Sequence, residues 1–317
     1  AQAGEIYFTG SGTEADNWAL RGAAYAQKAR GRHIITTQIE HHAVLHAAEQ
    51  LEKEGFEVTY LPVDGDGVVS LEALEKALRP DTTLVSIMAA NNEIGAIQPI
   101  REAAKLAKAH GALFHTDAVQ AIGCVPIDVK ADGIDLLSLS GHKFHAPKGV
   151  GALYVRSGAN LAPVWRGGHQ ERGLRPGTQN TAFFAALGQA AQMLDVAAMN
   201  EVCAGLSARL WQGLAQIEGV VRNSPPGGHP AIANFSVPGI RSETMLHFLE
   251  ARDVYVSSGS ACSKGEASHT LSAMGLAKER IDSAVRVSFS AHSTPADVDA
   301  LLAGVAEGVK SLARARR

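Results

Sequence analysis

Short apolar runs alternate with amphipathic stretches over the first half of the chain. Runs rich in β-branched residues predict strands at 5–9, 33–38, 57–61, 84–88, 113–117, 135–140 and 151–155. Between them, apolar residues at helical spacing predict helices at 15–30, 43–54, 71–78 and 100–110. Strands joined by crossover helices form a mostly parallel sheet, so the pattern predicts an α/β fold.

The pattern changes after residue 160. A glycine- and arginine-rich loop at 166–178 precedes an alanine-rich stretch that predicts one long helix from about Thr181 past Trp211. Mixed strands and helices follow a turn-rich segment at 223–230. We therefore predict a large domain at residues 1–199 and a smaller α+β domain at residues 200–317. Because the chain opens on Ala1 and reaches a strand-like run almost at once, we expect that an N-terminal segment of the large domain is missing from this sequence.

Composition limits the classes of protein that need to be considered. Hydrophobic residues make up 46% of the 317 positions, which is enough for two domains with cores. A net charge of -3 indicates no nucleic-acid-binding surface. No apolar run approaches the roughly 20 residues of a membrane helix, so we expect no membrane partner and a cytoplasmic location. Cys124, Cys203 and Cys262 form no C-x-x-C pair, so we expect neither disulfides nor a metal site.

Candidate chemistry gathers where predicted strands end, the edge at which open parallel sheets bind ligands. Small residues at 10–13, with Gly12 and Thr13, would let backbone N–H groups at a helix N-terminus approach an anion. Lys143 follows one strand and Asp117 closes another. A lysine that holds an aldehyde and a carboxylate that keeps a pyridine nitrogen protonated are what pyridoxal phosphate requires. Alone, these features are typical of a capped turn, a solvated lysine such as Lys148, and a capping carboxylate; together they predict this cofactor.

Seven motifs along essentially the whole chain resemble those of cysteine desulfurases. They are Thr13-Glu14-Ala15-Asp16-Asn17, Glu40-His41-His42-Ala43-Val44, Asn91-Asn92-Glu93-Ile94-Gly95, His115-Thr116-Asp117-Ala118-Val119-Gln120, Ser140-Gly141-His142-Lys143, Arg175-Pro176-Gly177-Thr178 and Ser258-Gly259-Ser260-Ala261-Cys262. Their order and spacing resemble the NifS/IscS branch of the class V aminotransferases. The resemblance implies fold type I of the pyridoxal-phosphate enzymes, with a mostly parallel sheet in the large domain and a smaller α+β C-terminal domain.

The resemblance also implies a role for each matched residue in binding the cofactor. Lys143 would hold the aldehyde and later shuttle the substrate α-proton, Asp117 would pair with the pyridinium nitrogen, and His41 would stack on the ring. The phenolic oxygen would be hydrogen-bonded by Gln120 and Asn92. The phosphate would be bound by Gly12, Thr13, Ser140 and His142 and by Thr178 from a second subunit, which makes the expected enzyme a homodimer.

Cys262 decides which reaction the resemblance implies. Glycines and serines flank it at 257–263, which is typical of an exposed loop. Its thiolate would take the sulfur of L-cysteine, leaving L-alanine and an enzyme persulfide, while Arg286 would bind the substrate carboxylate. The sulfur would pass to an acceptor such as an iron–sulfur scaffold protein. From Cys262 to Ser268 the loop is shorter than in members that serve scaffold proteins, and an asparagine usual ahead of the first motif is absent.

Four other functions stay open at this point. A selenocysteine lyase or an aminotransferase of the same fold would share most of the motifs. A non-catalytic homologue that only docks sulfur acceptors would need neither Lys143 nor Cys262. A thiol hydrolase would need a histidine base for Cys262; His269 is the nearest in sequence, and no nucleophile motif accompanies it.

Overall fold

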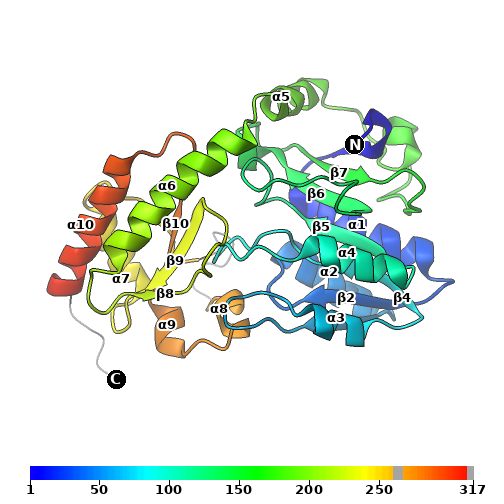
Figure 1. Cartoon of the computed structure of the whole chain (residues 1–317). Coiled ribbons are helices and arrows are strands. Elements are labelled where there is room, and N and C mark those ends of the chain that lie inside the picture. Colours follow the sequence, from blue (N-terminus) through cyan, green and yellow to red (C-terminus); the bar gives the residue numbers. More distant parts are fainter. Residues whose placement is uncertain (260–266, 313–317) are drawn as a thin grey trace. The chain divides into compact units, whose positions relative to one another are not determined.

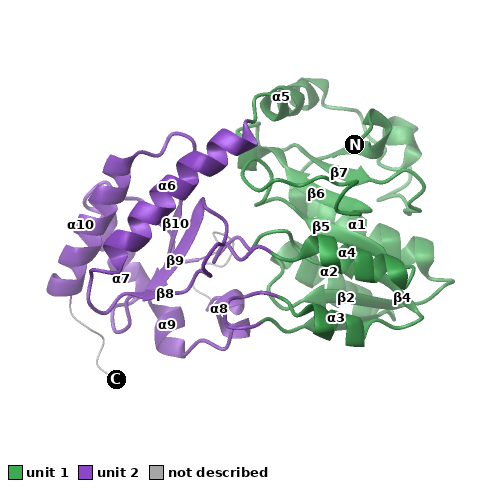
Figure 2. Cartoon of the chain, in the orientation of Figure 1, with its two compact units in different colours: residues 1–63, 69–90, 98–194 green, residues 64–68, 91–97, 195–317 purple. Residues whose placement is uncertain are grey.

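The computed structural model describes residues 1–259 and 267–312 (Figure 1). Contacts divide the chain into two compact units (Figure 2). Unit 1 consists of Ala1–Val63, Val69–Ala90 and Gln98–Leu194, and unit 2 of Asp64–Val68, Asn91–Ile97 and Asp195–Arg317. The division at Asp195 precedes a helix, whereas the predicted boundary between residues 199 and 200 lies inside it. Unit 2 also takes two short segments from the first half of the chain.

Unit 1 contains a seven-stranded sheet in the order β1-β7-β6-β5-β4-β2-β3. The strands are β1 (Ile6–Thr9), β2 (His33–Thr37), β3 (Glu57–Leu61), β4 (Thr82–Ser86), β5 (Leu113–Asp117), β6 (Leu136–Ser140) and β7 (Gly151–Val155). Neighbouring strands from β3 to β6 are parallel, and β7 runs antiparallel to both β6 and β1. The prediction of a mostly parallel sheet is confirmed.

The helices of unit 1 follow the predicted alternation with the strands. They are α1 (Gly12–Gln27), α2 (His42–Lys53), α3 (Leu71–Ala77), α4 (Ile100–Ala109) and α5 (Thr181–Gln192), with 3-10 turns η1 (Ala3–Glu5), η2 (Gly141–Phe144) and η3 (Gln170–Gly173). α1 begins where the side chain of Ser11 accepts a hydrogen bond from the backbone of Glu14, at 3.1 Å. It then packs along β4, β5, β6 and β7.

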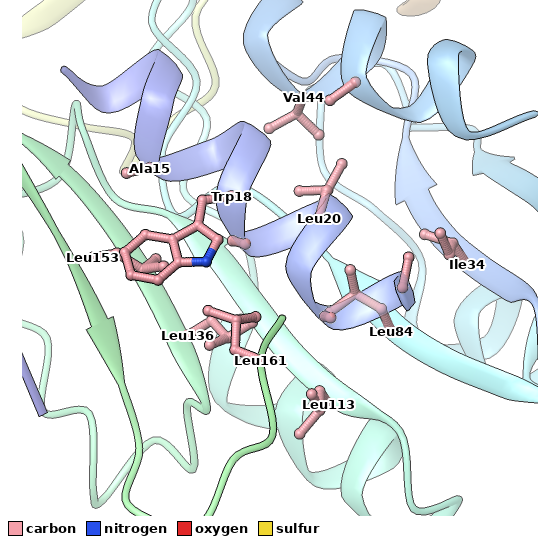
Figure 3. Close-up of a cluster of buried hydrophobic side chains, with 14 of the residues drawn as sticks. Ala15, Trp18, Leu20, Ile34, Val44, Leu84, Leu113, Leu136, Leu153 and Leu161 are labelled. Carbon is pink, nitrogen blue, oxygen red and sulfur yellow. The ribbon is translucent and has the colours of Figure 1, made fainter. Parts of the chain in front are cut away.

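One face of α1 forms the centre of the core of unit 1 (Figure 3). Trp18 and Leu20 from this helix lie among Leu84, Leu136 and Leu153 of the sheet. The indole N–H of Trp18 donates to the carbonyl of Ala162 at 2.9 Å, so the one polar atom of this buried ring is satisfied. This packing fixes the N-terminus of α1 against the carboxyl ends of the strands.

Several predicted elements differ from the structure in their bounds. The helix predicted at 15–30 begins and ends three residues earlier, because Ser11 caps it. The strand predicted at 84–88 begins and ends two residues earlier, because Thr82 and Thr83 are buried β-branched residues hydrogen-bonded to His33. The predicted single helix from Thr181 past Trp211 is two helices, α5 and α6 (Val196–Leu214). Asp195 separates them, since its carboxylate caps α6 by accepting from Ala198 N at 2.9 Å.

Unit 2 is an antiparallel sheet with helices, as predicted for the smaller part of the chain. Its strands are β8 (Val221–Arg222), β9 (Ile232–Ser236) and β10 (Ala284–Ser288), in the order β10-β9-β8. Its helices are α6, α7 (Ser242–Glu250), α8 (His269–Ala273), α9 (Lys278–Asp282) and α10 (Pro295–Ser311). A core of its own, which includes Leu210, Phe235 and Val305, joins these elements.

Across the described part of the chain, no helix taken singly has both the length and the apolar composition needed to cross a membrane. The pair α5 and α6 meets these criteria by length and composition only when the two helices are added together across their break.

Candidate cofactor and substrate site

Asp117 and Lys143 lie at the carboxyl ends of adjacent parallel strands. β5 ends at Asp117, which pairs in register with Ser138 of β6. β6 ends at Ser140, and the 3-10 turn η2 that follows carries His142 and Lys143. The side chain of Lys143 is exposed, and its positive charge acts on Asp117. The structure therefore brings the two residues to one edge of the sheet.

The carboxyl group of Asp117 is held in a buried position and is ready to bind a cation. It is 5% exposed, and its Oδ1 accepts a hydrogen bond from Val119 N at 2.8 Å. Burial raises the pKa of Asp117 to about 6, against the opposing effects of the Val119 N–H and the charge of Lys143. At neutral pH Asp117 is thus mainly ionised, and a protonated pyridine nitrogen fits it as a partner.

The turn into α1 is packed against the same edge of the sheet. A Cβ atom on Gly12 would lie 2.7 Å from Cγ2 of Val119 and 3.3 Å from Cβ of Ser140, so only glycine fits without displacement. The backbone here is the N-terminus of α1, where N–H groups bind anions, and Thr13 is exposed beside it. The turn at Gly12 and Thr13 therefore forms a cradle that fits a phosphate group.

Two histidines near this edge have fixed hydrogen bonds. Nδ1 of His41, the N-cap of α2, accepts from Ala43 N at 3.1 Å, which leaves the proton of the neutral ring on Nε2. Nδ1 of His142 is 2.9 Å from the hydroxyl of Ser140. Burial lowers the pKa of His142, and the charges of Lys143 and Lys148 lower it further. His142 is therefore a neutral hydrogen-bonding group at pH 7.

The remaining predicted residues of unit 1 lie in loops. Gln120 is half-buried, in the turn that follows Asp117. Thr178 is exposed, just before α5. The loop that carries Thr178 is anchored by Arg175, whose guanidinium pairs with Glu14 of α1 at 2.8 Å.

Unit 2 contains the residues predicted to recognise the substrate. A guanidinium N–H of Arg286, on β10, donates to the carbonyl oxygen of Asn92 at 3.1 Å. The backbone N–H of Arg286 also donates to the carbonyl of Ser257 at 2.6 Å. Cys262 lies outside the described residues. Of the other cysteines, Cys124 and Cys203 are buried, as expected for thiols without a catalytic role.

Several buried polar residues were missed as candidates. Asp16, Glu40 and His115 stand within the quoted motifs, but no role was assigned to them from the sequence. All three side chains are nearly or fully buried in unit 1. The available signal was a charged or polar residue at a position where the helix or strand faces the core. Within the described ranges no cluster of three or more His, Cys, Asp or Glu residues could hold a metal ion.

Comparisons with known proteins identify the family of the chain. The aminotransferase class-V family matches residues 1–301. A cysteine desulfurase IscS of Clostridium botulinum is 49% identical over 310 residues, covering 95% of this chain and 78% of that protein. Another, from Methanosarcina thermophila, is 49% identical over 317 residues, covering 98% of this chain and 78% of its own length. The solved structure of a NifS-like protein has a TM-score of 0.92 at 39% identity and covers 98% of this chain and 84% of its own.

The family match spans most of the chain, and the relatives share nearly half of their aligned residues with it. The chain belongs to the aminotransferase class-V family and, within it, to the cysteine desulfurases that depend on pyridoxal phosphate.

Proposed function

We propose that this chain uses Lys143, Asp117 and Cys262 to remove the sulfur of L-cysteine and to pass it as a persulfide to an acceptor protein. The observation that carries the proposal is the buried, mainly ionised carboxyl of Asp117 at a strand end, with the charge of Lys143 acting on it. Pyridoxal phosphate, when bound through Lys143, supplies an electron sink for the charge left on the substrate as sulfur departs.

Residues around Asp117 and Lys143 would each bind a different part of the cofactor or the substrate. Asp117, itself held by Val119 N, would pair with the protonated ring nitrogen, and His41 would cover the ring. Gln120 and Asn92 would hydrogen-bond the phenolic oxygen. The phosphate would be held by the turn at Gly12, by Thr13, Ser140 and His142, and by Thr178 of a second subunit. Arg286 binds the substrate carboxylate through two N–H groups, a geometry that lysine does not offer.

Lys143 and Cys262 carry out the proton and sulfur steps. The amine of Lys143 takes the α-proton of cysteine. The thiolate of Cys262 attacks the substrate sulfur, so a sulfur–sulfur bond forms and the carbon–sulfur bond breaks. The bonding electron pair stays with the β-carbon, which takes up a proton, and Lys143 returns a proton to the α-carbon to give L-alanine. A thiol acceptor that attacks the persulfide restores Cys262.

Exposed apolar side chains of unit 1 support a homodimer. Met193, at the end of α5, is 75% exposed, and Trp165, in the loop that also carries Thr178, is 47% exposed. Apolar side chains left in solvent mark a surface that binds a partner when they form one contiguous patch. A second copy that covers them would bring Thr178 to the partner's phosphate. The acceptor of the persulfide is proposed to be a scaffold protein for iron–sulfur clusters or for other sulfur-containing cofactors.

The test traps the cofactor and the sulfur on named side chains. Wild-type protein incubated with pyridoxal phosphate should be yellow, and borohydride should attach the cofactor irreversibly to Lys143, as read by peptide mass. Lys143→Ala should lose this adduct, whereas Lys148→Ala, a matched change of an exposed lysine five residues away, should keep it. A colourless wild type in saturating cofactor would refute the proposal.

The sulfur step is followed in the same preparations by intact mass after addition of L-cysteine. The wild type and Cys203→Ser should each gain one sulfur atom, and Cys262→Ser should gain none. Cys262→Ser should still develop the colour change that accompanies cysteine binding. Full turnover to alanine and sulfide by Cys262→Ser would contradict the assignment of the persulfide to this residue.

A further inference from the structure

Asp16 is a second buried carboxyl group close to Asp117. It belongs to the first turns of α1, four residues after Gly12, and is 1% exposed. The carboxyl groups of Asp117 and Glu40 both lie near enough to affect it electrostatically. None of the steps proposed for the reaction uses Asp16, so a carboxyl group buried at this place requires an explanation of its own.

The groups that face Asp16 from the sheet are neutral. Nε2 of His115, on β5, lies 3.7 Å from Oδ1 of Asp16 and 3.0 Å from the hydroxyl of Ser138 on β6. Nδ1 of the same ring is 2.8 Å from the hydroxyl of Ser86 on β4. Burial lowers the pKa of His115 to about 3, so the ring carries no charge at neutral pH. His115 therefore cannot act as the cationic partner of Asp16.

A third carboxyl, Glu40, faces the pair from the segment after β2. Its Oε1 accepts hydrogen bonds from the Thr37 hydroxyl at 2.7 Å and from Met88 N at 2.9 Å. Burial raises the pKa of Glu40 to about 8 despite these two bonds. It is therefore largely neutral at pH 7 and adds little to the charge around Asp16.

The burial of Asp16 favours its neutral form. Among the described residues, no hydrogen-bond donor reaches its Oδ1 atom. A buried carboxyl group with one oxygen unpaired and no cation beside it favours the protonated form. Burial raises the pKa of Asp16 well above its usual range, the charge of Asp117 adds to this rise, and the Ser138 hydroxyl opposes it.

When two carboxyl groups share one buried region, the group with more hydrogen-bond donors and positive charge near it stays ionised. Asp117 has both, because the Val119 N–H donates to its Oδ1 and the positive charge of Lys143 is nearby. The contacts of the two residues therefore favour an ionised Asp117 and a protonated Asp16.

We propose that Asp16 is the protonated member of this carboxyl pair and a positioning residue for the cofactor: neutral beside His115 and Ser138, it leaves the negative charge of the pair on Asp117. This inference rests on the proposed role of Asp117 as the partner of the ring nitrogen. A full charge on Asp117 makes a stronger bond to a cation than a charge divided between two side chains.

The first test observes the proton directly in the wild-type apo-protein. Infrared spectra are recorded at neutral pH with and without carbon-13 labelling of aspartate. We expect a carboxylic-acid C=O band that shifts with the label, is present in the wild type and is absent from Asp16→Asn. The lack of a labelled band in the wild type, or its persistence in Asp16→Asn, would overturn the proposal.

The second test uses the pH dependence of unfolding by urea of the apo-protein. A carboxyl whose pKa is raised by folding contributes stability that is present below its unfolded pKa and is lost as pH rises through its folded pKa. Asp16→Asn removes that loss, so its urea midpoint should rise relative to the wild type between about pH 5 and about pH 8. A midpoint difference that stays constant or falls would count against a protonated Asp16.

The matched control for this test is Asp135→Asn. Asp135 is also buried, but it is paired with Arg156 at 2.5 Å and accepts from Phe114 N at 2.8 Å. The ion pair of Asp135 with Arg156 should stabilise the fold over the whole range from about pH 5 to about pH 8. Asp135→Asn should therefore unfold at a lower urea concentration than the wild type throughout that range.

The third test measures the affinity of the apo-protein for pyridoxal phosphate. An amide resembles a neutral acid, so Asp16→Asn should bind within about threefold of the wild type, while Asp117→Asn should bind far more weakly. If Asp16→Asn lost as much affinity as Asp117→Asn, Asp16 would carry charge and the proposal would fail. If Asp117→Asn kept its affinity, the proposed role of Asp117 would fail, and the positioning role of Asp16 with it, even with the infrared band present.

Discussion

Asp117 changes its charge close to physiological pH, and this determines how cofactor binding should respond to acid. Burial raises its pKa to about 6 in the protein without cofactor. Above that pH the carboxylate can accept a charge-assisted hydrogen bond from the ring nitrogen. Below it, the carboxyl is increasingly neutral, and the bond weakens.

Replacement of Asp117 by Asn should weaken binding of pyridoxal phosphate roughly 10- to 100-fold at about pH 8, the usual value of a hydrogen bond to a charged group. The difference from the wild type should shrink as pH falls through about 6, because the wild-type carboxyl is then protonated too. Quenching of tryptophan fluorescence by the cofactor measures both affinities. An equal deficit at all pH values would show that the charge of Asp117 is not what binds the ring.

At the scale of elements, the helix α1 links the core to the candidate phosphate cradle. Trp18 and Leu20 bury its middle against the sheet, and Ser11 caps its first turn. Gly12 lies between these two features and touches the ends of β5 and β6 through Val119 and Ser140. The position of the cradle therefore depends on the absence of a side chain at Gly12.

Gly12→Ala should push this turn away from the sheet. The added methyl group would lie 2.7 Å from Cγ2 of Val119, and overpacking of this kind costs roughly 1–3 kcal/mol. Urea unfolding of the apo-protein measures that loss, and the affinity for pyridoxal phosphate should fall with it. Gly188→Ala in α5, where nothing lies within 4 Å of the new Cβ, should instead stabilise by up to about 1 kcal/mol. A Gly12→Ala variant as stable as the wild type would show that the turn relaxes freely.

The sequence pattern predicted two strands of the large sheet well because every residue in them is buried. β5 and β7 begin and end as predicted, since each is a short apolar run bounded by turns. The break before α6 escaped prediction because alanine-rich residues continue the helical pattern on both sides of Asp195, and one capping carboxylate outweighs them.

The candidate site was predictable to the extent that its residues lie in motifs at strand ends. Asp117 and Lys143 follow or close buried strands, and parallel pairing must then bring them to one edge. The protonation of Asp16 was not predictable, because it depends on His115 and Ser138, which only the folded sheet brings beside it. The assignment of Asn91–Ile97 to unit 2 is likewise a property of tertiary contacts, such as the bond from Asn234 to the carbonyl of Glu93 at 3.1 Å.

On the scale of the whole molecule, the exposed Met193 allows the proposed homodimer to be tested. A charge at this apolar side chain, which is 75% exposed, should not disturb the fold of one chain but should oppose burial against a second. Met193→Glu should therefore shift the protein toward monomer in analytical ultracentrifugation, and bind pyridoxal phosphate more weakly through the loss of the partner's Thr178. Lys105→Glu, a charge change at an exposed position of α4, is the control and should leave the mass unchanged. A Met193→Glu protein that remains dimeric would place the interface elsewhere.

The strand β7, which runs antiparallel to both of its neighbours, limits where insertions can occur near this site among related proteins. Gly151 at the start of β7 stands opposite Thr9 of β1 on one side and opposite Ser140 of β6 on the other. The two halves of the phosphate cradle follow Thr9 and Ser140, which are far apart in the sequence. The pairing of both residues with Gly151 keeps the two halves in register. A shift of either neighbour by two residues along β7 would part them by about 7 Å, more than the width of a phosphate group. Insertions in relatives should accordingly spare this strand and collect in the loops beyond it.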